Sequence, residues 1–338
     1  MIGHVYSDAT ITNCSIDADS SVSCAEDRSG SDAKAGALIG TVNKRTTRIN
    51  NCSSAATVNN VNAQQPVADG LVGRVCALGQ VIIGEENWTT HTVFANLLNS
   101  GSDIELNYNY HLGEVGTTIA QAEALIDSMT GTKTIDGKKH TIYGLVRPLI
   151  TSRGESDITI KDLTISNANI KSTRSQANGM GTAAFVGYID FESNSLVMDN
   201  CKLVYSHVEG LEEDVRTAGL VGHVSQGTVS ITNCVVENCT IKSADGAAAI
   251  INITMATTTI SNCKVLGNTS ITSTEVRNSN SNTAFIVGSV QPSSTTTISD
   301  IEVSTTVTIS RAGTATPVHA WVGRIISGGS ATVDGTAL

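Results

Sequence analysis

The sequence has few of the large side chains that fill the core of most globular domains. Aromatic residues make up 4% of its 338 residues, charged residues make up 15%, and only four prolines occur. Serine, threonine, asparagine, valine and isoleucine supply much of the remainder. Because β-branched residues favour extended backbone, this composition predicts a β-rich protein.

Two further absences exclude classes of partner. The net charge is −10, and the lysines and arginines form no stripe that would neutralise phosphate groups. No apolar run reaches the roughly 18 residues that a membrane-spanning helix requires. We therefore expect no nucleic-acid partner and no insertion into a membrane.

Motifs for metals and cofactors are also missing. The eight cysteines form no CxxC pair, which is the spacing that zinc sites use. P-loop, zincin and RTX calcium patterns do not occur either, so we expect no cofactor. One acidic loop, at 209–216, brings together Glu212, Glu213 and Asp214. Such a loop either binds calcium or, more commonly, forms a solvated edge.

What the chain does contain is an internal repeat. A glycine-marked block recurs about 30 to 37 residues apart, except for a longer gap between Gly73 and Gly187. A period in this range is typical of solenoids and related arrays. The copies are AGALIGTV (35–42), DGLVGRV (69–75), TAAFVGYI (182–189), TAGLVGHV (217–224), TAFIVGSV (283–290) and HAWVGRI (319–325), with AAAIINI (247–253) as a variant that has Asn252 at the glycine position.

A second block places Asn or Asp immediately before a compact apolar residue. The polar positions are Asn13, Asn51, Asp162, Asn200, Asn233, Asn262 and Asp300. The apolar slot holds Cys14, Cys52, Cys201, Cys234 and Cys263, with Leu163 and Ile301 in the remaining copies.

These blocks predict a right-handed parallel β-helix of repeats of about 30 to 37 residues, an all-β solenoid. Each repeat reads as three short β segments, which cannot bury an apolar face until coils stack. Equivalent residues of successive coils then lie about 4.8 Å apart. The Asn and Asp residues would form a ladder at a bend, where an unpaired buried amide costs about 1 to 3 kcal/mol. The slot cysteines would fill the core as reduced thiols.

The repeat is interrupted in the first half of the chain. We expect a first β-helix array at 1–84, a non-repeating segment at 85–130 and a second array at 131–338. Two runs in or near that segment, 92–98 and 120–129, have apolar residues at helical spacing. They predict one or two short helices that cap a coil or loop out between coils.

The sequence begins and ends within a repeat. Residues 1–16 align with 220–236, which places Met1 and Ile2 in the middle of a repeat, and one more strand around Val333 follows the last marker glycine. An uncapped coil exposes unpaired backbone groups. We therefore expect either a segment of a longer repeat protein or end-to-end contacts with copies of the same chain.

The glycine-marked blocks resemble the GLUG-type repeats of bacterial and protist surface proteins, most closely in AFVGYI, GLVGHV and FIVGSV. Residues 87–170, with TIDGKKHTIYGL and ITIKDLTISNANI, resemble the opening segment of β-helix adhesin-like proteins. The resemblance implies a pectate-lyase-like β-helix, a fold that carries adhesins, polysaccharide lyases and inert stalks.

Two groups of residues are candidates for chemistry or binding. Asp136 and His140 could supply an acid and a base near a groove, or they shape the bend of a DGKKH turn. Trp88, Tyr108, Tyr110 and Tyr143 could form an aromatic surface for carbohydrate, or a local core under the inserted helices. Among the glycosylation sequons, those at Asn87 and Asn268 best suit glycan attachment.

We expect a non-enzymatic extracellular or cell-surface protein, an adhesin-like or structural β-helix that presents binding or assembly surfaces. Its partners would be neighbouring repeats end to end, surface carbohydrate or a protein receptor. The alternative is a carbohydrate-active β-helix enzyme, either a polysaccharide lyase or a glycoside hydrolase. Such an enzyme needs two carboxylates, or a carboxylate with Lys or Arg, converging on one groove, and the charges of the second array fall in loops of different register.

Overall fold

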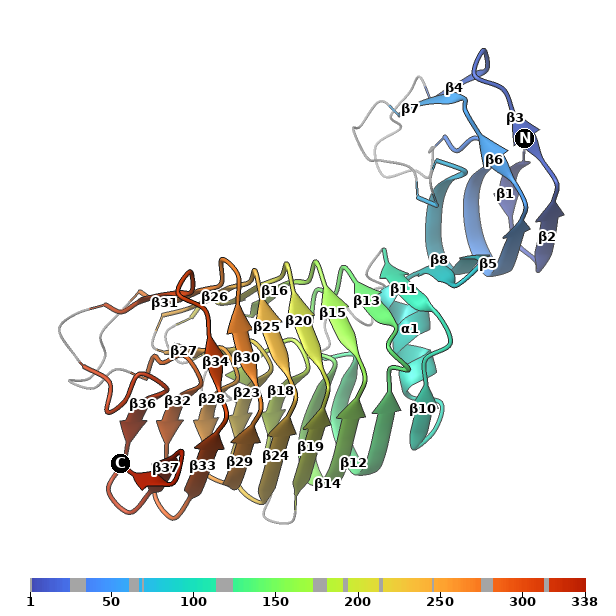
Figure 1. Cartoon of the computed structure of the whole chain (residues 1–338). Coiled ribbons are helices and arrows are strands. Elements are labelled where there is room, and N and C mark those ends of the chain that lie inside the picture. The colour runs from blue at the N-terminus through green and yellow to red at the C-terminus, as the bar shows by residue number, and fades with distance from the viewer. Residues whose placement is uncertain are drawn as a thin grey trace. The chain divides into compact units, whose positions relative to one another are not determined.

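The computed structural model describes residues 2–24, 35–60, 67–68, 70–113, 124–172, 181–190, 194–212, 215–244, 246–274, 282–312 and 316–338. The described chain is nearly all-β and forms a parallel β-solenoid of about eight turns of about 34 residues each (Figure 1). This confirms the predicted fold class. The chain divides into two compact units: unit 1 comprises residues 1–97 and 107–121, and unit 2 comprises residues 98–106 and 122–338.

Unit 1 is built around two long strands that pair in parallel, β5 and β8. The neighbouring strands β1 and β2 both pair in parallel with β5, whereas β9 turns back and pairs antiparallel with β8. Its elements are β1 (Ile2–Val5), β2 (Ala9–Thr12), β3 (Ser15–Ile16), β4 (Ser21–Cys24), β5 (Ile39–Asn50), β6 (Ser53–Ser54), β7 (Thr57–Asn60), β8 (Val72–Ile83), β9 (Glu86–Thr89), α1 (His91–Leu98) and β11 (Asn109–Leu112).

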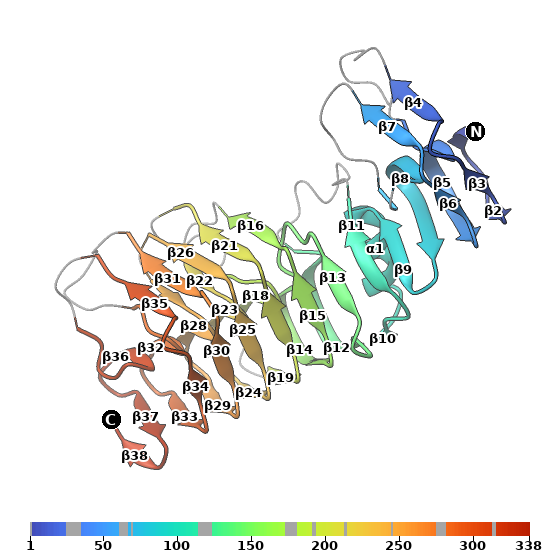
Figure 2. The same cartoon turned by 45° about the horizontal axis from the view of Figure 1, so that its top comes forward.

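Unit 2 contains one large sheet and three smaller columns of strands. Figures 1 and 2 both show β19, β24, β29 and β33 side by side, in the order of the chain. The large sheet comprises β10 (Asp103–Glu105), β12 (Ile126–Asp136), β14 (Ile150–Lys161), β18 (Val186–Ile189), β19 (Ser195–Asp199), β23 (Val221–Val224), β24 (Thr228–Thr232), β28 (Ile251–Thr254), β29 (Thr257–Ser261), β32 (Val287–Val290), β33 (Thr295–Ser299), β36 (Val322–Ile325), β37 (Ser330–Val333) and β38 (Thr336–Ala337).

The smaller columns follow the large sheet around each coil. The first comprises β13 (Thr141–Tyr143), β15 (Thr164–Ser166), β20 (Lys202–Val204), β25 (Val235–Glu237), β30 (Lys264–Leu266) and β34 (Glu302–Val303). The second comprises β16 (Asn169–Ser172), β21 (His207–Gly210), β26 (Thr240–Ser243), β31 (Ser270–Ser273) and β35 (Thr308–Ser310). The third comprises β17 (Gly181–Thr182), β22 (Arg216–Ala218) and β27 (Ala247–Ala248).

A full coil therefore has five strand segments, for example β22 to β26, where the sequence predicted three. The glycine-marked block contains two of these segments, β22 and β23, and the chain after the Asn-Cys bend forms the other additional one, β25. A Cβ at Gly222 would lie 2.4 Å from the carbonyl oxygen of Gly187 and 2.6 Å from the backbone nitrogen of Thr182 in β17. The marker glycine is thus required where one backbone passes directly over another.

Alternation along the strands explains the abundance of threonine. In β29, Thr257 and Thr259 are exposed, whereas Thr258 and Ile260 are buried. This strand therefore presents threonine hydroxyl groups to solvent on one face and buries Thr258 and Ile260 on the other. In unit 1 the same alternation produces a core of Ile39, Val42, Ile49, Val72 and Val81.

The residues of the bend ladder share one unusual backbone conformation. All seven have φ between 50 and 56°, which is the left-handed region. Asn and Asp tolerate this region better than other residues that carry a Cβ. Side-chain amides also bond from coil to coil: Asn51 Nδ2 donates to Asn13 Oδ1 at 2.7 Å, and Asn262 Nδ2 donates to Asn233 Oδ1 at 2.6 Å.

The ladder has one break and one extension. Asn233 Nδ2 donates to Asp199 Oδ1 at 2.7 Å, and no bond joins it to Asn200. Asp334, with φ of 46°, continues the column beyond Asp300, whose backbone N–H donates to Asp334 Oδ1 at 3.2 Å. The ladder therefore combines amide and carboxylate groups.

The apolar slot beside the ladder faces the interior of unit 2. Leu163, Cys201, Cys234 and Cys263 are fully buried. Ile301, Cys14 and Cys52 are only half-buried. The seven cysteines whose side chains the structure describes are all free thiols.

The sequence expectations failed at two places. The helical spacing at 120–129 does not produce a helix, because β12 begins at Ile126; residues 120–123 lie outside the described part of the chain.

The end of the sequence was expected to supply one strand and no covering element. The structure instead has a hairpin, in which Asp334 and Gly335 turn with positive φ and β38 pairs antiparallel with β37. An Asp-Gly pair between two strands is the usual signal for such a turn.

We predict that the left-handed bend contributes more to stability than the amide bond does. Asn262→Ala should lower the free energy of unfolding by about 2 to 3 kcal/mol, because it combines left-handed strain with a lost hydrogen bond. Asn262→Gly loses the bond without the strain, and should recover about 1 kcal/mol of that loss. Urea denaturation of the two variants measures the difference. Equal destabilisation of the two would contradict the role of the bend.

We also predict two classes of thiol. Hydrogen bonding within the thiol column raises the pKa of Cys234 and Cys263, and burial raises the pKa of Cys239 to about 11. Little thiolate therefore forms at neutral pH, and alkylation should be slow. Iodoacetamide labelling read by mass spectrometry should modify Cys14 and Cys52 first in the native protein. Disulfide-linked peptides, or uniform labelling rates, would show that the buried column is wrongly described.

Candidate functional site

The central sheet of unit 1 has one apolar face and one polar face. Ile11, Ile49, Val81 and Trp88 point to the apolar face and pack on the core of the unit. The residues next to them in sequence point the other way. Across the strands, Thr10 pairs with Arg48, Arg48 with Ile82, Ile82 with Asn87, and Asn87 with Tyr110.

Three adjoining recesses lie along this polar face, with volumes of about 370, 660 and 250 Å³. All three share Thr46, so they form one continuous depression, here called the polar groove. Its lining residues are Asp8, Ala9, Thr10, Lys44, Arg45, Thr46, Arg48, Leu78, Gln80, Ile82, Asn87, Thr89, Val93, Phe94, Asn96, Leu97, Asn107, Tyr108 and Tyr110.

Aromatic side chains form one end of the polar groove. The helix α1 supplies Phe94, whose ring centroid lies 4.8 Å from that of Tyr110. Tyr108 is half-buried and meets Tyr110 edge-on, with centroids 6.2 Å apart. Burial, with a smaller contribution from Tyr108, raises the pKa of Tyr110 to about 12. Its phenol therefore stays protonated and can donate a hydrogen bond at neutral pH.

A buried amide lines the same end of the groove. Asn87 is 2% exposed, and its Oδ1 has no hydrogen-bond partner among the described residues. Its Nδ2 reaches Gln80 Oε1 at a long 3.5 Å. An unpaired buried acceptor costs about 1 to 3 kcal/mol, unless water or a ligand satisfies it. A side chain buried to this extent also leaves no room for a covalently attached glycan in the folded protein, which argues against the Asn87 sequon favoured above.

The other end of the groove is cationic. Lys44 and Arg45 line it, Arg48 lines both this end and the recess of the tyrosines, and Asp8 is the one carboxylate among the described lining residues. Asp8 Oδ1 accepts a hydrogen bond from the backbone N–H of Thr46 at 3.0 Å. The groove can therefore bind neutral polar groups at one end and anionic groups at the other.

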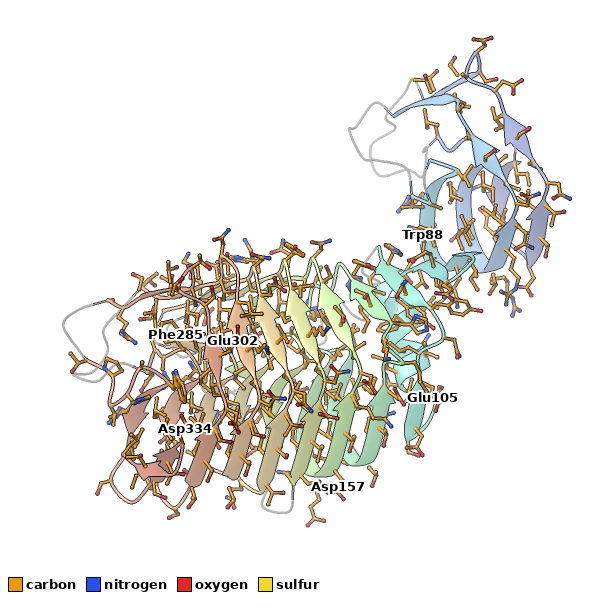
Figure 3. All side chains as sticks on the ribbon, viewed as in Figure 1. Trp88, Glu105, Asp157, Phe285, Glu302 and Asp334 are labelled. Atoms are coloured by element: carbon orange, nitrogen blue, oxygen red, sulfur yellow. The ribbon has the colours of Figure 1, made fainter. Side chains whose placement is uncertain are left out.

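The four aromatic residues proposed from the sequence do not form one surface. Tyr108 and Tyr110 meet in the groove. Trp88, labelled in Figure 3, lies on the opposite face of the sheet and stacks on His111 with centroids 4.8 Å apart. Tyr143 belongs to β13 in unit 2. Sequence reasoning missed Arg48, Gln80 and Asn87, which come from three strands and follow no recognised motif.

Asp136 and His140 lie in a tight turn of unit 2. The Asp136 carboxylate lies 3.2 Å from the Nζ atoms of both Lys138 and Lys161. Burial raises the pKa of this carboxyl, but hydrogen bonds from Lys138 and Lys161 outweigh that effect and hold it below its usual value. The backbone N–H of His140 donates to the Gly137 carbonyl at 2.8 Å. No hydrogen bond or ion pair joins Asp136 to His140 in the described structure. The pair therefore shapes a bend, which Gly137 and the left-handed Lys138 and Lys139 complete.

The acidic loop at 209–216 is described only in part. Glu212 is exposed, while Glu213 and Asp214 lie outside the described residues. Within the described ranges, no group of three or more His, Cys, Asp or Glu side chains could hold a metal ion.

The described helix is too short to cross a membrane. The chain matches no protein-family model, no curated protein and no solved structure.

We predict that the unpaired amide of Asn87 lowers the free energy of unfolding of unit 1. The test uses a Trp321→Phe background, which leaves Trp88 as the single tryptophan. In that background, Asn87→Leu should raise the free energy of unfolding of unit 1 by about 1 kcal/mol, because it removes an unpaired buried acceptor. Urea denaturation followed by Trp88 fluorescence measures this. The control is Asn107→Leu, an exposed residue of the same lining, with an expected change within about 0.5 kcal/mol. Destabilisation by Asn87→Leu would mean that Asn87 is already satisfied within the fold.

Proposed function

We propose that the chain is a non-enzymatic β-solenoid that binds carbohydrate in the polar groove of unit 1. The observation that carries the proposal is the combination of a tyrosine pair with a buried, unpartnered amide in one recess. The solenoid of unit 2 would serve as the regular stalk or assembly surface of an extracellular, adhesin-like protein with GLUG-type repeats.

The groove chemistry supports a sugar as ligand. One face of a pyranose ring is largely C–H and packs on aromatic rings, and the half-buried ring of Tyr108, supported edge-on by Tyr110, provides such a surface. Its hydroxyl groups need partners that both donate and accept. The amide of Asn87 and the side chain of Gln80 supply such partners at the recess. A pocket that is mostly apolar, with a few fixed polar groups, is typical of small-ligand sites.

The same residues favour binding over cleavage. Hydrolysis of a glycoside requires two carboxyl groups roughly 5 to 9.5 Å apart across the scissile bond. The described lining contains one carboxylate, Asp8, which lies away from the tyrosine end. A polysaccharide lyase would need a base and a cation that both contact the sugar. Asp136, the candidate from the sequence, is instead paired with two lysines in unit 2.

We predict that Tyr108→Ala weakens binding of oligosaccharides by about tenfold. Loss of one ring contact removes about 1 kcal/mol or slightly more. A glycan array selects the saccharide, and calorimetry on the full chain then measures the dissociation constant. The control is Tyr205→Ala, which removes a tyrosine that is 64% exposed in unit 2 and should leave binding unchanged.

Two results would reject the proposal. One is the absence of any saccharide ligand on the array, which would leave a purely structural role for the solenoid. The other is release of reducing ends or unsaturated sugars from a bound saccharide, which would favour the carbohydrate-active enzyme.

A further inference from the structure

We propose that the ligand of the polar groove is an extended acidic polysaccharide, whose carboxylate or sulfate groups pair with Lys44, Arg45 and Arg48. The inference rests on the proposed function and adds the chemical class of the sugar. It starts from the distribution of charge, which differs between the groove and the rest of the described chain.

Five lysines of unit 2 are paired with neighbouring carboxylates. Lys138 and Lys161 pair with Asp136, Lys171 and Lys242 pair with Glu209, and Lys264 pairs with Glu302, which is labelled in Figure 3. These pairs lie on the strand columns of unit 2, where residues of successive coils stand side by side. Single cations such as Lys202 lack such a partner among the described residues, whereas the groove brings three unpaired cations together.

The groove cations depart from this pattern. No ion pair or side-chain hydrogen bond engages Lys44, Arg45 or Arg48 with any other described residue. The nearby carboxylate, Asp8, is turned to the backbone N–H of Thr46. Three cations and one carboxylate leave the described lining with two excess positive charges, in a chain whose net charge is −10. An anionic ligand supplies the missing partners.

The backbone around these cations is also irregular. The register between β5 and β8 shifts between Val42 and Lys44, where β8 has one residue more than β5, which marks a bulge in β8 opposite these cations. Arg45 follows with φ of 70°, a left-handed conformation that a long side chain rarely adopts. A bulge changes the direction of the side chains that follow it and is common beside binding sites. Here it accompanies a change from buried residues to the exposed cations of the groove.

The groove extends beyond one sugar ring. The row from Thr10 through Arg48, Ile82 and Asn87 to Tyr110 crosses five strands. Neighbouring strands lie about 4.8 Å apart, so the row is roughly 19 Å long. The amide and Tyr110 lie at one end of the row and Arg48 lies toward the other, while Lys44 and Arg45 lie further along β5. A chain of several sugars, with one ring on the tyrosines and acidic groups further along, fits this order.

The same features argue against a nucleic acid. Nucleic acids carry closely spaced phosphates and bind to long basic surfaces, whereas the groove has three cations in a strongly acidic chain. Single strands also stack several bases on exposed rings, and Tyr110 is 6% exposed. A polysaccharide with one charge per sugar has wider charge spacing and offers hydroxyl groups for Asn87.

The test compares saccharides that differ only in charge. The full chain is titrated by calorimetry with oligogalacturonate and its methyl ester, and with a sulfated heparin fragment and its desulfated form. We expect the charged member of at least one pair to bind at least tenfold more tightly than the neutral member. The advantage should shrink as salt is raised from about 50 to 200 mM, because screening weakens ion pairs.

Three variants locate the effect. Arg48→Gln should weaken binding of the charged probe about tenfold and remove its preference over the neutral probe, and Arg48→Lys should retain most of the preference. The control is Lys202→Gln, an exposed lysine of β20 in unit 2 without an ion-pair partner among the described residues; it should change nothing. Thermal unfolding of each variant checks that the fold is intact.

The outcomes separate the two proposals. Equal binding of charged and neutral probes would overturn the acidic class and leave a neutral carbohydrate site. Binding of none of these probes, and of no glycan on an array, would overturn both proposals. Tighter binding of a single-stranded oligonucleotide than of any saccharide, with loss on Arg48→Gln, would overturn this inference in favour of nucleic acid.

Discussion

The architecture depends on one backbone conformation that successive coils adopt at the same place. After β14, β19, β24, β29, β33 and β37 the chain turns through a left-handed Asn or Asp, whereas the coil of β12 has Gly137 at that position. If one coil turned elsewhere, the strands that follow would lose register with their neighbours on both sides. A second left-handed column, at Asn167, Tyr205, Asn238 and Gly267, fixes the next bend in the same way.

Close backbone approach imposes a second constraint, which the glycine blocks satisfy. The short strands β17, β22 and β27 run so near the large sheet that a Cβ at Gly222 or Gly288 would meet backbone atoms. Asn252 takes the glycine position in one coil and is fully buried, with neither side-chain polar atom bonded to a described residue. That coil tolerates a buried amide because the neighbouring Gly288 leaves room beside it.

The sequence contained most of the information about the solenoid and little about the groove. Repetition made the ladder visible, since each Asn-Cys pair is a copy of the others, and periodic spacing is what stacking requires. The helix at 91–98 was visible from Phe94, Leu97 and Leu98. The run at 120–129 was misread because apolar residues at helical spacing also suit a strand buried on both faces, as Ile126 and Met129 are in β12. Arg48, Asn87 and Tyr110 meet only after four strands, β5, β8, β9 and β11, have paired, and two of the three pairings lie outside the repeat.

The parallel pairing of each coil with the next also determines how the solenoid would respond to force. Every column in unit 2 joins a coil only to its two neighbours, so a load applied at one end is carried by the outermost coil first. Stability in such arrays is a sum of nearest-neighbour terms, and coils would therefore detach one at a time. Each release would lengthen the molecule by the extended length of about 34 residues, roughly 110 to 120 Å. A stalk of this kind would lengthen under load in uniform steps, one coil at a time.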